Sequence, residues 1–449
     1  MNTKHIAIIG NGISGVTAAR FIRKLSDHRI TIISSETPHF YSRTALMYIY
    51  MGHMRMEDTK PYEDWFWDKN KIALVQDHVE SVDFNKKELT LKKGDPLQYD
   101  DLIIATGSKS NKFGWPGQDL EAVGGLYTLQ DVDRMEKYSK DLNRAVIVGG
   151  GLIGIEMAEM FHARGIPVTI LVRESNYWSN VLPHEESSMI SKHIKDHHFD
   201  LRLESNLEEI IDDGSGKACA VIVKETGERI DCGFVGLTPG VSPNVNFLKE
   251  TDLKVERGVI VNEFLETNIP GVYAIGDCAQ RFEALPGRRP IEAVWYTGKM
   301  MGETVAYNIC GKKIAYDPGI WFNSAKFIDI EYQVYGDVLS KPPENHQSLF
   351  WMHDDQTKSI RIVYDKNTNE VLGFNLFGIR YRHEVCEKWI RTGTSIETVL
   401  QNLSLANFDP EFYKEYEQEL VDIYNQQNGT ALKLKEKRSL SRVLQFLSR

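Results

Sequence analysis

The sequence predicts an α/β protein with two parallel βαβ domains and a smaller α+β domain at its C-terminal end. A strand, a glycine turn, a helix and a second strand follow one another from residue 5, and the same order returns from residue 144. Such a return is an internal repeat at the level of whole domains. From about residue 321 the pattern changes, and a hairpin-like alternation in SIRIVYDKNTNEVLGFNLFG precedes two helical stretches.

Composition limits the function classes. The chain has 449 residues, which is enough for two to four domains. Its net charge of -10 and pI of about 5.8 argue against general nucleic-acid binding. It has no apolar run of the ~18–20 residues that cross a bilayer, and its N-terminus runs directly into a strand pattern. We therefore expect a cytoplasmic protein without a transmembrane segment.

The first repeat contains the turn GNGISG between a continuously apolar strand and a helix. Gly10 permits the tight turn, Gly12 lets backbone approach a pyrophosphate, and Gly15 lets helix and strand pack closely. The N-terminus of the helix adds free N–H groups and the positive end of its dipole. This Rossmann-like fingerprint predicts a dinucleotide site, to which we also assign Ser14.

An acidic residue follows the second strand of this repeat. Glu36 stands about 20 residues beyond the glycine turn, where a carboxylate can bind ribose hydroxyl groups. Ser34 and Ser35 are its neighbours in the same predicted role. The alternative is that Glu36 is a solvated loop residue.

The second repeat carries GGGLIG between a strand and a helix. We assign nucleotide binding to its turn and first helical residues: Gly149, Gly151, Leu152, Ile153 and Gly154. Two fingerprints in one chain are a stronger signal than either alone, and two dinucleotides indicate hydride transfer between a nicotinamide and a flavin.

With these motifs, and with LIIATG, TNIPGVYAIGDCA and GLIGIE, the chain resembles the pyridine nucleotide–disulfide oxidoreductases, a superfamily of two-dinucleotide-binding flavoproteins. The resemblance implies FAD and a nicotinamide nucleotide as cofactors. It implies that Asp277 binds the ribitol of FAD and that Glu156 faces the flavin–nicotinamide region. Further FAD contacts are implied at Ala105, Thr106, Gly107, Gly240 and Gly276.

The resemblance also implies a domain order. An FAD domain (1–113 and 245–320) is interrupted by an NAD(P)H domain (114–244) and followed by an interface domain (321–430) and a basic tail (431–449). Because the C-terminal domain is the dimer interface in many members of the superfamily, we expect a homodimer.

The choice between NADPH and NADH depends on the end of the strand VTILV. Val172 takes the position where NAD-preferring members carry an acid, and Arg173 follows it. An arginine fork matches the oxygens of a 2′-phosphate, which favours NADPH. The alternative is that Glu174 binds the ribose hydroxyls of NADH and Arg173 is solvated.

The stretch FYSRTALMYI lacks the cysteine that disulfide- and peroxide-reducing members place beside the flavin, and the first 218 residues contain none. It resembles instead the corresponding stretch of ferredoxin and rubredoxin reductases, with Arg43 at the matching arginine. Their lysine falls on about Tyr48. We assign Arg43 to the FAD phosphates, and to the catalytic site with Glu156 as one candidate pair. Cys278 is interpreted as a small buried hydrophobic residue.

Two further segments remain open. In the superfamily, the region of IEAVWYTGKMMGE begins a helix directed at the flavin ring, so Trp295 is assigned either to the cofactor or to core packing. The tail LKLKEKRSLSRVLQFLSR has an amphipathic pattern with six basic residues and one acidic residue. It is either a terminal helix packed on its own chain or a peripheral contact for an anionic membrane or acidic partner.

The motifs and the resemblance together predict an FAD-dependent NAD(P)H oxidoreductase. The resemblance favours a ferredoxin- or rubredoxin-like iron–sulfur protein as the electron acceptor. The alternatives are an oxidase or quinone reductase with a diffusible acceptor, and a flavin-stabilised interaction protein that senses redox state.

Overall fold

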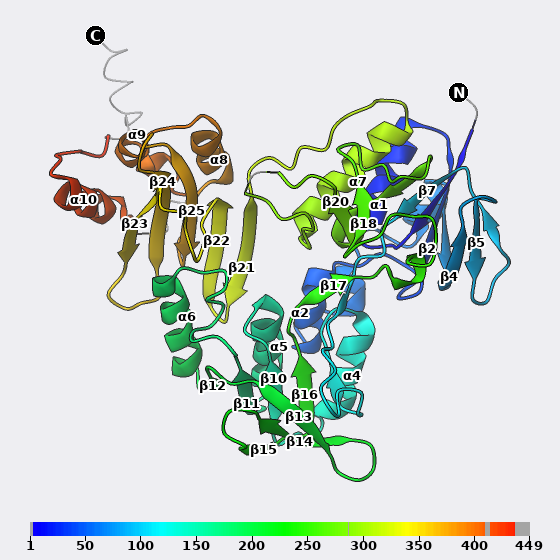
Figure 1. The fold of residues 1–449 in the computed structure, drawn as a ribbon, viewed down its shortest axis with the longest axis horizontal. Coiled ribbons are helices and arrows are strands. Elements are labelled where there is room, and N and C mark those ends of the chain that lie inside the picture. Colours follow the sequence, from blue (N-terminus) through cyan, green and yellow to red (C-terminus); the bar gives the residue numbers. More distant parts are fainter. Residues whose placement is uncertain (1–2, 286, 409–413, 436–449) are drawn as a thin grey trace. The chain divides into compact units, whose positions relative to one another are not determined.

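The computed structural model describes residues 3–285, 287–408 and 414–435 (Figure 1). The chain forms two compact units, which are Met1–Arg173 with Glu204–Pro318, and Glu174–Leu203 with Gly319–Arg449. Most of the predicted amphipathic tail lies outside the described residues, and the finer domain boundaries stay a prediction. None of the helices in the described ranges combines the length and apolar character that a bilayer crossing requires.

A five-stranded parallel sheet with the order β19-β7-β1-β2-β3 organises the first half of the first unit. Its strands are β1 (His5–Ile9), β2 (Arg29–Ser34), β3 (Ile72–Gln76), β7 (Asp101–Ile104) and β19 (Val272–Ala274). The parallel pairing of β1 and β2 around helix α1 (Ile13–Leu25) confirms the first predicted βαβ unit.

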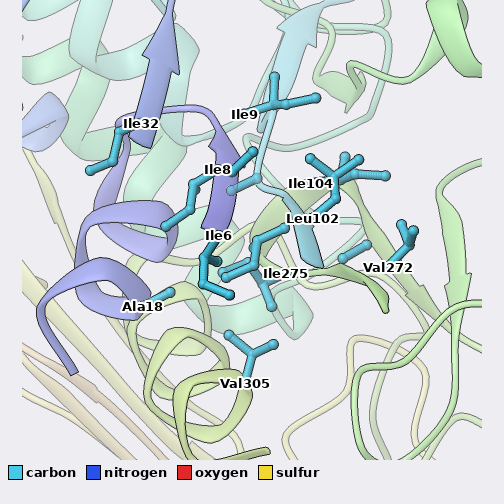
Figure 2. Packing of buried hydrophobic residues seen from close by; sticks show 14 of the residues in the cluster. Ile6, Ile8, Ile9, Ala18, Ile32, Leu102, Ile104, Val272, Ile275 and Val305 are labelled. Atoms are coloured by element: carbon cyan, nitrogen blue, oxygen red, sulfur yellow. The ribbon is translucent and has the colours of Figure 1, made fainter. Parts of the chain in front are cut away.

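The core of this half explains why its strands are continuously apolar. Ile6, Ile8 and Ile104 are buried among the strands, and Ala18 of α1 and Val305 of α7 (Trp295–Ile309) pack against them (Figure 2). A strand covered on both faces has no solvent side, so polar alternation is absent. The helices α1 and α7 approach closely, because a Cβ on Gly302 would lie 2.6 Å from the carbonyl oxygen of Ser14.

A second parallel sheet confirms the other predicted βαβ unit. Strand β10 (Ala145–Val148) pairs with β11 (Val168–Leu171) and β16 (Phe234–Leu237), and β16 pairs with β9 (Val123–Gly124). Helix α5 (Leu152–Ala163) connects β10 to β11. The glycine turns thus both lie at the carboxyl end of the first strand of a βαβ unit, where α/β sheets bind ligands.

The second unit is α+β. Its antiparallel sheet has the order β21-β22-β25-β24-β23, and β24 (Ser359–Asp365) with β25 (Val371–Phe377) confirms the predicted hairpin. Both predicted helical stretches form, as α8 (His383–Arg391) and α10 (Glu417–Asn428). Residues 174–203, which carry helix α6 (His184–Asp196), pack with this unit.

The remaining elements are smaller. In the first unit they are η1 (Arg43–Ala45), α2 (Leu46–Tyr50), η2 (Met56–Thr59), α3 (Trp65–Lys69), β4 (Val79–Asp83), β5 (Glu88–Leu91), β6 (Leu97–Gln98), β8 (Ser108–Ser110), α4 (Leu129–Ser139), β13 (Leu207–Asp212), β14 (Ala218–Val223), β15 (Arg229–Asp231), β17 (Val241–Pro243), η3 (Asn246–Leu248), β18 (Val259–Val261), η4 (Gly276–Cys278) and β20 (Ala279–Arg281). In the second they are β12 (Asp200–Arg202), β21 (Phe322–Phe327), β22 (Ile330–Gly336), β23 (His346–Met352), α9 (Ile396–Gln401) and η5 (Leu403–Leu405).

Candidate functional site

The first glycine turn is tightly packed except at its centre. Gly10 has a φ of +116°, and a Cβ there would lie 2.1 Å from the carbonyl oxygen of Ala105. A Cβ on Gly15 would lie 2.1 Å from the carbonyl oxygen of Gly10. Around Gly12, by contrast, no described atom lies within 4 Å of the Cβ position. The turn therefore needs two glycines for its own packing and offers open backbone at the third.

Helix α1 presents its N-terminus at this opening. Gly12 is its N-cap, and in the described structure neither an acidic residue of the first turn nor a capping side chain occupies its N–H groups. Ser14 is buried where two other elements meet the helix, since a Cβ on Gly276 or Gly298 would lie 2.3 or 2.5 Å from its hydroxyl oxygen. Free N–H groups and the helix dipole favour an anion such as a pyrophosphate here.

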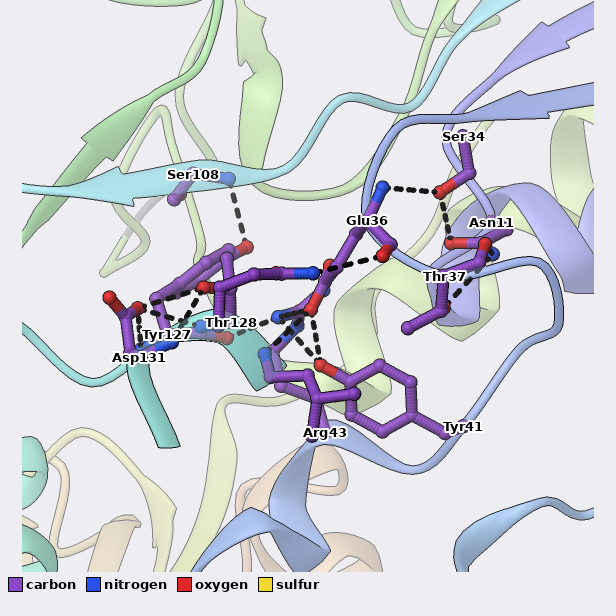
Figure 3. Close-up of polar contacts among 12 residues, drawn as sticks. Asn11, Ser34, Glu36, Thr37, Tyr41, Arg43, Ser108, Tyr127, Thr128 and Asp131 are labelled. Atoms are coloured by element: carbon purple, nitrogen blue, oxygen red, sulfur yellow. Dashed lines mark hydrogen bonds and ion pairs between the residues drawn. The ribbon is translucent and has the colours of Figure 1, made fainter. Parts of the chain in front are cut away.

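Glu36 lies at the end of β2 in an ion pair with Arg43 (Figure 3). Nη2 of Arg43 donates to Oε2 of Glu36 at 2.6 Å, and Oε1 accepts hydrogen bonds from the Tyr41 hydroxyl and the backbone N–H of Leu129. Burial opposes ionisation of Glu36, but the hydrogen bonds and charge of Arg43 outweigh it and lower its pKa. The neighbouring Ser35 is exposed.

Tyr127 connects this ion pair to Asp277. The Tyr127 hydroxyl donates to Oδ2 of Asp277 at 3.2 Å, and the Ser108 hydroxyl donates to the same oxygen at 3.2 Å. The guanidinium of Arg43 stacks 4.5 Å from the centroid of the Tyr127 ring. Desolvation raises the pKa of Asp277, although both hydrogen bonds favour the carboxylate. The structure thus brings Glu36, Arg43 and Asp277 into one polar chain.

The strand end LIIATG packs against Tyr127, the central residue of these polar contacts. A Cβ on Gly107 would lie 2.7 Å from the Tyr127 hydroxyl, so the close approach requires glycine. The Thr106 hydroxyl donates to the carbonyl oxygen of Asn244 at 2.8 Å, and the carbonyl oxygen of Gly240 accepts the backbone N–H of Asn111 at 3.0 Å. These contacts accompany the antiparallel pairing of β8 with β17.

Two residues of the site were not predicted from the sequence. Tyr127 stands in no motif and reaches Asp277 only through the fold. Asn11 is buried inside the first fingerprint, where its Nδ2 donates to the carbonyl oxygen of Thr37 at 2.8 Å and its Oδ1 accepts from the Ser34 hydroxyl at 2.9 Å. It fastens the turn to the end of β2 (Figure 3). Its position between two fingerprint glycines was the available signal.

The second glycine turn repeats the geometry of the first. Gly149 has a φ of +132°, and a Cβ there would lie 2.4 Å from the carbonyl oxygen of Thr238. Gly151, the N-cap of α5, has no described atom within 4 Å of its Cβ position. The first turn of α5 contains Leu152, Ile153 and Gly154 and no acidic residue. A second nucleotide phosphate can therefore approach here.

Glu156 lies one turn into α5. Burial and the charge of Glu159 raise the pKa of its carboxyl group to about 7. In the described part of the chain the Glu156 carboxylate makes no hydrogen bond or ion pair. The candidate pair of Arg43 with Glu156 does not form, because Arg43 pairs with Glu36. A carboxyl group that titrates near neutral pH beside a nucleotide turn is a candidate proton donor or acceptor.

Cys278 and Trp295 complete the candidate set. Cys278 is fully buried, its thiol donates to the carbonyl oxygens of Ile104 at 3.4 Å and Ile275 at 3.2 Å, and burial raises its pKa. Trp295 is the first residue of α7, and its ring lies 5.6 Å from that of Tyr296. A Cβ on Gly298, in the first turn of α7, would lie 2.5 Å from the hydroxyl oxygen of Ser14, so the start of this helix borders the first glycine turn.

Comparisons with known proteins identify the family of the chain. The family model "Pyridine nucleotide-disulphide oxidoreductase" matches residues 4–301. The NADH-rubredoxin oxidoreductase of Clostridium acetobutylicum is 29% identical over 408 residues, which cover 90% of this chain and 100% of that protein. The assimilatory nitrate reductase electron transfer subunit of Bacillus subtilis is 28% identical over 315 residues, and the match spans 69% of this chain but only 40% of that protein.

A solved structure supports the fold. The NAD-dependent persulfide reductase of A. fulgidus superposes with a TM-score of 0.83 at 20% identity, covering 97% of this chain and 86% of that one. The predicted fold class of two Rossmann-like domains and a C-terminal α+β domain is confirmed. Since the family model matches well over half of the chain, the protein belongs to the pyridine nucleotide-disulphide oxidoreductase family.

Proposed function

We propose that this protein is an FAD-dependent NAD(P)H oxidoreductase that passes electrons to an external acceptor, a small iron–sulfur protein of the rubredoxin or ferredoxin type. The observation that carries the proposal is the chemistry of segment 40–50. The segment holds Arg43, whose guanidinium bonds Glu36, but it contains no cysteine. A disulfide or peroxide acceptor requires an attacking thiolate. Electron transfer to a separate redox centre does not.

The residues of the first turn fit FAD. Open backbone at Gly12 and the N-terminus of α1 would hold the pyrophosphate, and Arg43, which bonds Glu36, would add its positive charge. Asp277 would accept hydrogen bonds from ribitol hydroxyl groups, which are strong when the acceptor is charged. When bound, FAD supplies the capacity to take a hydride from nicotinamide and release electrons singly.

Glu156 would hold or release a proton beside the nicotinamide. Its carboxylate has no described partner and its pKa is raised to about 7. It can therefore change protonation as charge develops during hydride transfer. The family resemblance places a glutamate at this point, and the shifted pKa supports a role in the reaction rather than in helix stability alone.

Cys278 does not replace the missing cysteine in this proposal. Its thiol is fully buried, is committed to two carbonyl oxygens, and has a raised pKa. The thiolate is the reactive form of cysteine, and an apolar environment suppresses it. The two neighbouring carbonyl oxygens would repel a thiolate further.

NADPH is the proposed electron donor. Val172 is buried, and a Cβ on Gly150 would lie 2.7 Å from its side chain, so an apolar residue packs against the second glycine turn. The exposed Arg173 follows directly. A carboxylate at position 172 would repel a 2′-phosphate, whereas a guanidinium attracts it. NADH use, with Glu174 on the ribose, is the competing outcome.

The names of two relatives support the choice of an iron–sulfur protein as the acceptor. The Clostridium acetobutylicum protein, which this chain matches over its full length, is named for rubredoxin. The Bacillus subtilis relative is named as an electron transfer subunit. We also propose a homodimer, which the mass of the FAD-loaded protein in light scattering would test.

Anaerobic stopped-flow spectroscopy of the FAD-loaded protein tests the proposal. NADPH and NADH are mixed with separate samples, and each reduced sample is then mixed with oxidised rubredoxin, a [2Fe–2S] ferredoxin, a quinone or oxygen. We expect fast flavin bleaching by NADPH and fastest reoxidation by an iron–sulfur protein. Faster reoxidation by quinone or oxygen would contradict the proposed acceptor. Slow bleaching with a long-lived charge-transfer band would favour a redox-sensing interaction protein.

A further inference from the structure

A histidine pair at the C-terminal end of α6 lies near an aspartate on the turn between β21 and β22, in the second unit; His193 is in the helix and His197 is its C-cap. His193 and His197 are one helical turn apart, and Asp329 belongs to the two-residue turn that joins the strands. One ligand atom from each of the three lies within 4.8 Å of the others. None of these residues takes part in the nucleotide sites described above.

We propose that His193, His197 and Asp329 form a binding site for a divalent transition-metal ion of the Zn²⁺ class. Two imidazoles and one carboxylate are a donor set that Zn²⁺ accepts, with water as the fourth ligand. The bound ion would fasten segment 174–203 to the sheet of the same unit. This site is independent of the proposed oxidoreductase activity.

The tautomer of His197 supports the site. Nδ1 of His197 lies 2.9 Å from the carbonyl oxygen of His193, and a carbonyl can only accept, so Nδ1 carries the proton. The neutral ring then has its lone pair on Nε2, which lies 3.9 Å from Oδ1 of Asp329. A backbone carbonyl that fixes the tautomer in this way is a usual companion of a metal-binding histidine.

The distances require only a small adjustment. Ligand atoms at Zn²⁺ distances in a tetrahedron lie about 3.3 Å apart. Nε2 of His193 is 2.5 Å from Oδ1 of Asp329, and Nε2 of His197 is 3.9 Å from it, so the observed pairs bracket this value. The Asp329 side chain is 69% exposed, which leaves it free to move and leaves a path for the ion and its water.

The surroundings hold the ligands in place. Phe327, directly before the turn, is fully buried and packs against Tyr177 and Trp178 of the segment that leads into α6. The two histidine rings lie 4.2 Å apart between centroids.

The alternative is a hydrogen bond from His193 to Asp329 that needs no metal. Nε2 of His193 is close enough to donate to Oδ1. That bond does not need His197, whose Nε2 lies 3.9 Å from the same oxygen, too far for a hydrogen bond. The contribution of His197 therefore separates the two accounts.

Co²⁺ and Zn²⁺ binding to the FAD-loaded, chelator-dialysed full chain tests the proposal. Co²⁺ is followed by its visible d–d absorption beyond the flavin bands, and Zn²⁺ by competition and by the midpoint of thermal unfolding. The variants are His197→Gln and Asp329→Asn, which alter partly or largely exposed side chains. The controls are His198→Gln, an exposed neighbour, and His383→Gln, which belongs to an i,i+4 pair with Glu387 on α8.

We expect one equivalent of tetrahedral Co²⁺ in the wild type and both controls, and at least about tenfold weaker binding in both variants. Zn²⁺ should raise the unfolding midpoint of the wild type and controls only. Equal affinity in the wild type and His197→Gln would overturn the proposal. So would a wild type that binds no Co²⁺ in a tetrahedral site.

Discussion

The hydroxyl of Tyr127 donates to Oδ2 of Asp277 at 3.2 Å, across 150 residues of sequence. The same hydroxyl accepts the backbone N–H of Ser108 at 2.8 Å, and the ring stacks against Arg43. Tyr127 therefore positions the carboxylate proposed to bind ribitol and connects it to the ion pair of Arg43 with Glu36.

Replacing Tyr127 by phenylalanine should weaken FAD binding about fivefold, the equivalent of about 1 kcal/mol for one hydrogen bond. The ring and its stacking on Arg43 remain, but Asp277 loses a donor. Fluorescence titration of the apoprotein with FAD measures the change. Tyr138→Phe is the control, because the Tyr138 hydroxyl bonds Glu121 at the surface of α4. Equal Kd values for Tyr127→Phe and Tyr138→Phe would refute the positioning role.

Arg43→Gln should have a larger effect. The guanidinium holds Glu36 ionised and is proposed to contact the FAD phosphates, and a hydrogen bond to a charged group contributes about 1.5–3 kcal/mol. We expect FAD affinity to fall by about 10- to 100-fold. Arg55→Gln removes a charge from an exposed pair with Asp58 and should leave the affinity unchanged. The prediction fails if both variants bind FAD like the wild type.

Glu156→Gln should remove a pH dependence near neutrality. In the wild type, the rate of flavin reduction by NADPH should change with a pKa of about 7, and in the variant it should not. Stopped-flow bleaching from about pH 5 to about pH 9 measures both. A wild-type profile without a transition in this range would exclude Glu156 from the reaction.

The same carboxyl group should make stability depend on pH. Its pKa rises from 4.5 to about 7 on folding, so between these values the folded state binds more protons than the unfolded state. The free energy of unfolding should therefore fall as pH rises through this window and level off above about pH 7. Urea unfolding of the wild type and Glu156→Gln would show whether the slope belongs to this residue.

Arg173→Gln should change the choice of nucleotide. Loss of the guanidinium should raise KM for NADPH about tenfold and leave KM for NADH nearly unchanged, because only NADPH has the 2′-phosphate. Steady-state kinetics with both donors measures the ratio. Arg229→Gln, at an exposed pair with Asp231, is the matched control. If Arg173→Gln impaired the use of NADH more than the use of NADPH, the result would instead support ribose binding at this strand end.

The local motifs were readable from the sequence because each is contained in one strand–turn–helix unit. Gly10, Gly12 and Gly15 have the packing that their spacing predicts, and Cys278 is the buried small residue that was expected. The hairpin of β24 and β25 was predicted from alternation and turn residues, which are also local.

Long-range partners were not readable in the same way. The hydroxyl of Tyr127 reaches Asp277 beside Gly107, where a Cβ would lie 2.7 Å from it, and no spacing rule connects residues so far apart. The pairing of Arg43 with Glu36 depends on the path of the loop after β2. His193 and His197 did carry a local signal, the i,i+4 spacing on a helix, but their third partner Asp329 lies more than 130 residues away.

The central claim is that electrons leave the flavin for an outside acceptor without a cysteine. Stopped-flow reoxidation of NADPH-reduced protein by oxidised rubredoxin or ferredoxin, compared between the wild type and Cys278→Ala, tests it most directly. We predict rates that agree within about twofold, because the thiol is buried and protonated. A Cys278→Ala protein that binds FAD normally but transfers electrons at least about a hundredfold more slowly would contradict the claim.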